Sequence, residues 1–196
     1  MKPLKVLGLH KDPWHNSGAA VIRSDGGRVE FATLSEERVD RIKDSRAFPS
    51  LSTQACMETL GVESLEEFDA VVLDFIINPN DWQKDHFRTP CSVDNFLTSV
   101  DPRKIHLVNH HLCHAYNVFF SSRFKDAAIL IVDGRGSDKE TQTLFHAKGG
   151  KITAVESTSE IGIGLLYAAV TQLIGFKILQ EGKTMGLAPY GRNDGR

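Results

Sequence analysis

The chain has 196 residues, of which 41% are hydrophobic and 24% are charged, and its formal net charge is −2. This composition is typical of a globular protein long enough for one large domain or two small ones. A sequence pI near 6.4 and the absence of long lysine or arginine runs argue against a dedicated nucleic-acid or membrane-surface protein. Three widely spaced cysteines, no signal peptide and no apolar run of membrane length favour a cytoplasmic location.

The chain is predicted to open with a meander of three strands, at residues 4–10, 19–23 and 29–34. Asp25-Gly26-Gly27 is a turn signal between the second and the third strand. A helix is expected from Ser50 to about Leu60, with Ser50 or Ser52 as its cap and Gly61 at its end.

Two buried strands are predicted after this helix, at residues 69–75 and 104–108. The poorly periodic segment between them, residues 78–100, is expected to hold short helices and loops. With a helix after the last strand, the order is β-β-β-α-β-α-β-α, which indicates an α/β fold.

A histidine-rich segment, residues 109–116, follows the last of these strands. Asn109 is a favourable cap for a helix that runs to about Ser121. His110 and His114 are four residues apart, so on a helix both imidazoles lie on one face and can reach a single ion. Spacing alone leaves open whether they bind a metal or are packed or solvated side chains, while Cys113 is more typical of a small core residue.

The opening pattern then repeats, with strands predicted at residues 127–133, 141–147 and 152–157 and a helix at 165–174 closed by Gly175. The helix carries an apolar stripe that is expected to face the core, formed by Leu166, Val170, Leu173 and Ile174. We therefore predict a first lobe at residues 1–125 and the start of a second at residues 126–196. About seventy residues are too few for a second lobe of the first lobe's length, so we expect a fragment of a longer chain.

Two loops between strands are predicted to cradle phosphate, because the first hairpin of each lobe presents backbone N–H groups to a cleft. The candidates in the first loop are Lys11, Ser17 and Gly18, and those in the second are Gly134, Arg135, Gly136 and Ser137. Gly162 and Gly164 open the last predicted helix and would let a phosphate approach its N-terminus. The alternative for each loop is an ordinary glycine turn after a strand.

A cluster of charged residues follows the third strand. Glu36, Arg38, Arg41 and Lys43 are candidates for a pocket that holds an anionic donor, because guanidinium groups bind phosphate in a bidentate manner. A solvated charge cluster is the competing interpretation.

Four motifs together resemble the O-carbamoyltransferases of nodulation-factor and antibiotic biosynthesis. They are His-His-x-x-His-Ala at residues 110–115, Asp-Gly-Arg-Gly-Ser at 133–137, Ser-Glu-Glu-Arg at 35–38, and the long segment Glu-Gly-Lys-Thr-Met-Gly-Leu-Ala-Pro-Tyr-Gly at 181–191. The resemblance runs from about Val6 to the last residue and covers the amino-terminal part of family members. It implies paired RNase H-like lobes of the actin, sugar-kinase and heat-shock ATPase superfamily.

The resemblance also implies roles for individual residues. His110, His114 and Asp133 match metal ligands of the family, and iron or zinc suits two imidazoles and one carboxylate. A further acidic ligand would lie beyond residue 196. His10 matches an active-site histidine that would act as the general base for an acceptor hydroxyl, against the plainer interpretation of an exposed histidine at a strand end.

Three residues outside this ligand set are interpreted separately. His111 matches no ligand of the family and is assigned to packing or the surface. Glu181 and Lys183 lie in the best-matching motif, where they would contact the nucleotide or order the glycine loop.

The implied reaction uses carbamoyl phosphate and ATP to form a carbamoyl-adenylate, whose carbonyl is attacked by a hydroxyl of a small-molecule acceptor. The expected partners are these substrates and the missing carboxyl-terminal portion of the same polypeptide, with no nucleic acid and no membrane. One alternative is a threonylcarbamoyl-transferring protein of tRNA modification, against which the lack of basic patches speaks. Another is a non-catalytic module that binds a metal or a nucleotide.

Overall fold

The computed structural model describes residues 3–11, 16–75 and 96–192. The chain divides into two compact units, residues 1–113 and 114–196, and each is described by itself. The division falls inside the histidine-rich helix α4 (His110–Ser121). Most of the segment expected to hold short helices and loops, residues 78–100, lies outside the described residues.

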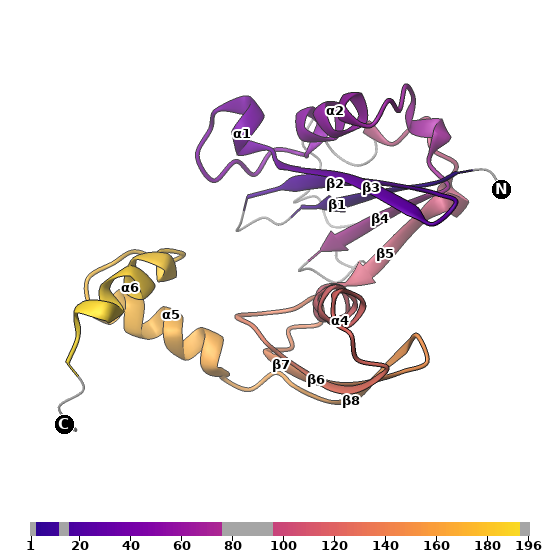
Figure 1. The fold of residues 1–196 in the computed structure, drawn as a ribbon. Coiled ribbons are helices and arrows are strands. Elements are labelled where there is room, and N and C mark those ends of the chain that lie inside the picture. The colour runs from indigo at the N-terminus through magenta and orange to yellow at the C-terminus, as the bar shows by residue number, and fades with distance from the viewer. Residues whose placement is uncertain (1–2, 12–15, 76–95, 193–196) are drawn as a thin grey trace. The chain divides into compact units, whose positions relative to one another are not determined.

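The first unit contains a five-stranded sheet in the order β3-β2-β1-β4-β5 (Figure 1). Its strands are β1 (Leu4–His10), β2 (Gly18–Asp25), β3 (Arg28–Ser35), β4 (Ala70–Phe75) and β5 (Ile105–Asn109). Strand β2 is antiparallel to both of its neighbours, whereas β1, β4 and β5 are mutually parallel. This order, with a single reversed strand, is that of an RNase H-like lobe, and the predicted α/β fold class is confirmed.

Helices and short turns connect these strands. Helix α1 (Glu37–Asp40) and helix α2 (Ser50–Thr59) follow the meander, and the 3-10 turns η1 (Leu65–Glu67) and η4 (Pro102–Lys104) precede β4 and β5. Helix α2 packs against β2 and β3 and covers one face of the sheet (Figure 1). Fully buried apolar side chains from these elements and from the segments that join them form the core, among them Leu7, Val21, Phe48, Phe68, Val71 and Leu73.

The start of helix α2 differs from the prediction that Ser50 or Ser52 caps it. The hydroxyl groups of Ser50 and Ser52 donate to the carbonyl groups of Phe48 and Pro49. The cap is instead the carboxylate of Glu36, which accepts from the backbone N–H groups of Leu51 at 3.0 Å and Ser52 at 2.8 Å. A carboxylate is favoured at this end of a helix because the free N–H groups carry partial positive charge.

The second unit repeats the antiparallel meander with β6 (Asp126–Val132), β7 (Gln142–Lys148) and β8 (Lys151–Thr158). Helix α5 (Ile163–Leu173), helix α6 (Glu181–Leu187) and the turn η5 (Ala188–Tyr190) follow. Gly149 and Gly150 form the turn between β7 and β8 with positive φ, a conformation that glycine adopts without strain.

The apolar stripe of α5 was predicted to be core, and this is wrong for the residues that the structure describes. The exposed fraction is 58% for Leu166 and 85% for Leu173, and Val170 and Ile174 are also exposed. Periodicity indicates which face of a helix is apolar, but burial also needs a partner element against that face. The side chain of α5 that is buried is Thr171, whose hydroxyl group is 2.8 Å from that of Thr184 in α6.

None of the helices in the described part of the chain combines the length and the apolar character needed to cross a bilayer.

Candidate metal and acid–base site

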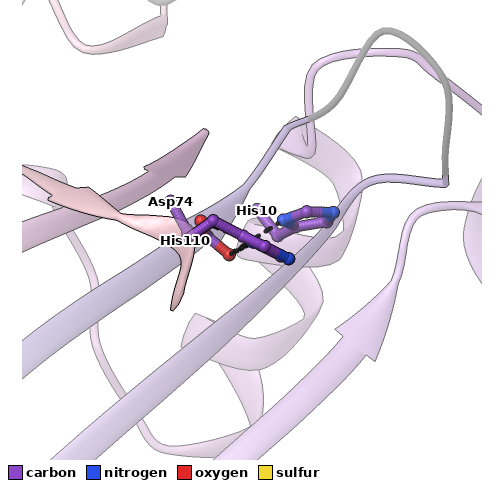
Figure 2. A group of neighbouring side chains, drawn as sticks. All are labelled: His10, Asp74 and His110. Carbon is purple, nitrogen blue, oxygen red and sulfur yellow. Dashed lines mark hydrogen bonds and ion pairs between the residues drawn. The ribbon is translucent and has the colours of Figure 1, made fainter. Parts of the chain in front are cut away.

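Three polar residues meet at the carboxyl ends of the parallel strands in the first unit. His10 is the last residue of β1, Asp74 pairs with it in the register of β4, and His110 follows β5 as the first residue of α4. Because β1, β4 and β5 run side by side in the same direction, their ends bring these side chains together (Figure 2). Open α/β sheets place their ligands at this edge.

The carboxylate of Asp74 lies between the two imidazoles. Nδ1 of His10 is 3.2 Å from Oδ2 of Asp74, and Nδ1 of His110 is 3.1 Å from each carboxylate oxygen. The ring centroids of His10 and His110 are 6.2 Å apart. His110 is buried, whereas the side chain of His10 is 32% exposed, so a solute can reach the His10 ring.

The surroundings of Asp74 keep its carboxyl group ionised. Burial raises its pKa, but hydrogen bonds from His10 and His110, and the positive charge of these rings whenever they are protonated, lower it by more, so the net pKa lies below the usual range. The same negative charge acts on Cys113. Burial, and then the charge of Asp74, raise the pKa of this thiol to about 12.

Sequence reasoning placed β4 correctly but did not single out Asp74. A signal was available, because Asp74 is the acidic residue near the end of an otherwise apolar strand, Ala70–Phe75. A charged side chain in that position is costly unless it is paired. An acidic residue near the end of an apolar strand is therefore a candidate for a site at that edge of the sheet.

The predicted metal ligands His110 and His114 lie one turn apart on α4. The side-chain oxygen of Asn109 accepts from the backbone N–H of Leu112 at 3.1 Å, which confirms the predicted cap. In the second unit, Nε2 of His114 is 3.8 Å from Oδ2 of Asp133, a separation too long for a hydrogen bond. The structure thus brings His114 close to Asp133, two of the three residues that were expected to share an ion.

Ser17 and Gly18, two of the phosphate candidates in the first loop, take part in backbone structure. Ser17 is buried, its N–H donates to the carbonyl of Ser45, and its hydroxyl group donates to the carbonyl of Ala47. Gly18 opens β2 opposite Ser35. The backbone N–H of Lys11 is 3.4 Å from the carbonyl oxygen of Asp74, and residues 12–15 of the loop lie outside the described part of the chain.

The second predicted phosphate loop is a tight turn held by its own residues. The N–H of Gly134 donates to Oδ1 of Asp133 at 2.6 Å, and the N–H of Gly136 donates to the carbonyl of Glu140 at 2.6 Å. Ser137 is buried and Arg135 is exposed. Both glycine amides are therefore engaged inside the loop, which favours the structural interpretation of this turn.

The two helix-opening glycines also have neighbours. Gly162 is the N-cap of α5 and lies beside Thr141, while Gly164 lies against the backbone of Asp133 and Gly134. Close packing accounts for both positions without a phosphate.

The charged cluster separates into one buried and three exposed residues. Glu36 is 1% exposed and holds α2, whereas Arg38, Arg41 and Lys43 are exposed to solvent. The structure therefore gives Glu36 a role in the fold that the sequence did not predict.

Three other residues of interest are placed as follows. His111 is fully buried, so it belongs to packing and not to the surface. Glu181 opens α6 and is partly buried. Nζ of Lys183 donates to Oε1 of Gln180 at 3.0 Å and lies 5.7 Å from the ring centroid of Phe176.

Comparison with known proteins supplies the family. The Nodulation protein NolNO of Sinorhizobium fredii is 33% identical to this chain over an alignment covering 90% of this chain and 28% of that protein. The Nodulation protein NolO of Bradyrhizobium diazoefficiens is 34% identical over 44% of this chain and 16% of that protein. Among solved structures, YeaZ from Pseudomonas aeruginosa covers 79% of this chain and 65% of its own, with 12% identity and a TM-score of 0.44.

The chain spans about a third of the length of the first curated relatives that it matches, or less. Residues 75–196, more than half of the chain, match the family model described as the carbamoyltransferase N-terminus. This segment contains the histidine helix, the Asp133 turn and the motif at residues 181–191. The chain therefore belongs to the carbamoyltransferase family, as part of its amino-terminal region.

Proposed function

We propose that this chain is the amino-terminal part of an O-carbamoyltransferase. Carbamoyl phosphate would lose its phosphate to water and give carbamate, whose oxygen would attack the α-phosphorus of ATP and release pyrophosphate. A hydroxyl group of a small-molecule acceptor would then attack the carbonyl of the resulting carbamoyl-adenylate and displace AMP. Membership of the carbamoyltransferase family supports carbamoyl transfer. The observation that carries the site assignment is the meeting of His10, Asp74 and His110 at one sheet edge.

His10 is the residue proposed to take the proton from the acceptor hydroxyl. Its ring is partly exposed at a strand end, and its Nδ1 contacts an ionised carboxylate that stabilises the imidazolium formed by proton uptake. This pairing of a carboxylate with a histidine base is the same physical arrangement that hydrolases use to orient and stabilise their base.

His110, His114 and Asp133 are proposed to hold Fe(II) or Zn(II). Two imidazoles and one carboxylate suit either ion, and the structure supplies the helical spacing of the histidines and the His114–Asp133 pair. A bound ion would polarise the carbamoyl carbonyl or the phosphate oxygens. Asp74, which contacts Nδ1 of His110, would orient that ligand.

The test uses the full-length polypeptide that contains this chain. With ATP and carbamoyl phosphate present, we expect release of pyrophosphate that depends on carbamoyl phosphate, and a carbamoylated product when a hydroxyl acceptor is added. Mass spectrometry detects the product, and omission of carbamoyl phosphate is the control.

Three results would contradict the proposal, and each points to a different function. Retention of tRNA in a filter-binding assay, with transfer of a threonylcarbamoyl group to that tRNA, would indicate the threonylcarbamoyl class. ATP binding without turnover under every condition would indicate a non-catalytic module. ATP cleavage that does not respond to carbamoyl phosphate would indicate another ATP-dependent reaction.

A further inference from the structure

We propose that Asp74 is a positioning residue that holds both His10 and His110 in one tautomer, with the proton on Nδ1 and the lone pair on Nε2. A single carboxylate would thereby set the chemistry of two histidines that come from different strand ends. Figure 2 shows the three side chains, with dashed lines marking their contacts.

The argument begins with the atoms that meet. Both rings approach the carboxylate through Nδ1, and Oδ2 of Asp74 lies within 3.2 Å of both Nδ1 atoms. An ionised carboxylate can only accept hydrogen bonds, so each Nδ1 facing it must carry a proton. In a neutral imidazole the proton on Nδ1 leaves Nε2 with the lone pair.

The fold holds this geometry from two directions. His10 and Asp74 are register partners in adjacent parallel strands, so the backbone fixes their separation. His110 is the first residue of α4, which starts directly after β5, and β5 is the other neighbour of β4. Asp74 therefore lies on the central strand of the three and can reach a histidine on either side.

The consequence for each histidine is different, and it rests on the proposed function. For His110, Nε2 with its lone pair is the atom available to bind a metal ion. The carboxylate of Asp74 would orient this ring from Nδ1, as carboxylates commonly do for metal-binding histidines. For His10, the lone pair on Nε2 is the atom that would accept the hydroxyl proton. Loss of Asp74 would thus weaken the metal ligand and the base together.

The tautomers can be measured directly in metal-free protein labelled with ¹⁵N-histidine. The chain has eight histidines, and the spectra of His10→Gln and His110→Gln assign the two resonances of interest. In the unmodified chain we expect both rings to carry the proton on Nδ1. Detection of the Nε2–H tautomer at either ring would overturn the proposal, and this measurement needs no variant of Asp74.

Asp74→Asn is the second arm of the experiment. Its amide offers one acceptor oxygen and a donor NH₂ in place of two acceptor oxygens, so we expect at least one of the two rings to change to the Nε2–H tautomer. Unchanged tautomers in a folded Asp74→Asn variant would overturn the proposal.

The matched control is Asp126→Asn. Oδ1 of Asp126 is 2.8 Å from Nε2 of His146, a carboxylate–histidine pair of the second unit. This substitution should alter the His146 resonances and leave those of His10 and His110 unchanged.

Zinc titration separates this role from a simpler one, since the ligand atoms of His10, Asp74 and His110 all lie within 4.8 Å of one another. If Zn²⁺ shifted the Nδ1 resonances of both His10 and His110 as direct coordination does, the three residues would themselves form a metal site. The positioning role of Asp74 would then be wrong. We expect the shift at Nε2 of His110, and an affinity for Zn²⁺ about 10- to 100-fold weaker in Asp74→Asn.

Failure of this inference and failure of the proposed function give different results. Correct tautomers in a protein that shows no carbamoyl transfer would refute the function and leave the role of Asp74 standing. Carbamoyl transfer by an enzyme in which His10 and His110 carry the proton on Nε2 would refute the role of Asp74 and leave the proposed function standing.

Discussion

A Cβ atom built on Gly164 would lie 2.4 Å from the carbonyl oxygen of Asp133, a distance that no side chain can occupy without movement. The first turn of α5 therefore packs backbone to backbone against the turn that carries the proposed ligand Asp133. We expect Gly164→Ala to lower the free energy of unfolding of this unit by about 1–3 kcal/mol, as overpacking does. Urea denaturation followed by circular dichroism measures the change.

Gly182 is the matched control for Gly164. It lies in helix α6, and a Cβ atom there would meet no heavy atom within 4 Å. Gly182→Ala should be neutral or stabilising, by up to about 1 kcal/mol, because alanine loses less backbone entropy in a helix. Equal effects of the two substitutions would show that close packing at Gly164 is not what sets its identity.

Glu36 should be needed for stability more than any exposed acid of the first unit. Its buried carboxylate accepts two backbone N–H groups of α2, so Glu36→Ala would leave both without their acceptor and open a cavity. We expect a loss of about 2–4 kcal/mol in the free energy of unfolding, with Glu36→Gln intermediate. Glu30→Ala, which breaks the exposed pair with Arg28, should cost less than about 0.5 kcal/mol.

Strand β1 and the caps of α4 and α2 show which features of the fold a sequence pattern can predict and which it cannot. Strand β1 was predicted with its observed bounds, Leu4–His10, because apolar residues after Pro3 are a local signal. The Asn109 cap was also local, since it acts on a residue three positions ahead. Glu36 was missed as a cap because it precedes Leu51, the first residue that it caps, by fifteen residues, and its contacts with Leu51 and Ser52 exist only after β3 and α2 pack together.

The same distinction applies to the candidate site. The spacing of His110 and His114 is a property of one helix and could be read directly. Asp74 could not be paired with His10 from the sequence, because the contact depends on which strands are neighbours and on their register. The apolar stripe of α5 was misjudged for the converse reason, since a periodic pattern does not tell whether a partner element covers it.

Cys113 should react slowly with alkylating reagents despite partial exposure. With a pKa of about 12, roughly one thiol in 10⁴ is ionised at pH 8, and the thiolate is the reactive form. Labelling by iodoacetamide should therefore rise about tenfold for each pH unit between 8 and 10. Peptide mass spectrometry measures the rate, and the unfolded chain gives the unperturbed reference.

Asp74→Asn should speed the labelling of Cys113, because it removes a negative charge that raises the thiol pKa. Cys56 is the internal control. Burial alone raises its pKa, so its rate should be the same in both proteins. An unchanged rate at Cys113 would mean that the charge of Asp74 does not reach the thiol.

The amount of bound metal should differ among the alanine variants of three neighbouring histidines. His110→Ala and His114→Ala should each lower the metal bound per chain, because one helix turn places both imidazoles on the same face. His111 points about 100° away from His110 and is fully buried, so His111→Ala should lower stability while bound metal is retained. Elemental analysis of the folded fraction measures occupancy, and equal metal loss in all three variants would refute the helix-face assignment.

The proposed base, His10, should be needed for the chemical step and not for metal binding. In the full-length enzyme we expect His10→Ala to lower kcat for transfer to the acceptor hydroxyl by roughly a hundredfold or more, the usual contribution of a positioned base. Metal content should be retained, because His10 lies outside the set His110, His114 and Asp133. His146→Ala is the control, since this exposed histidine is paired with Asp126 in the second unit and should leave kcat unchanged.

The competing role for His10 is to bind the donor phosphate through a hydrogen bond, and the two roles differ in kinetics. Removal of a base lowers kcat, whereas removal of uniform binding raises KM and leaves kcat unchanged. The contact between His10 and Asp74 favours the base, because an ionised carboxylate stabilises the imidazolium that proton uptake creates and would repel a phosphate at the same ring. An unaltered kcat at saturating donor and acceptor would show that His10 is not the base, and the proton would then need another acceptor, such as His15 or a metal-bound hydroxide.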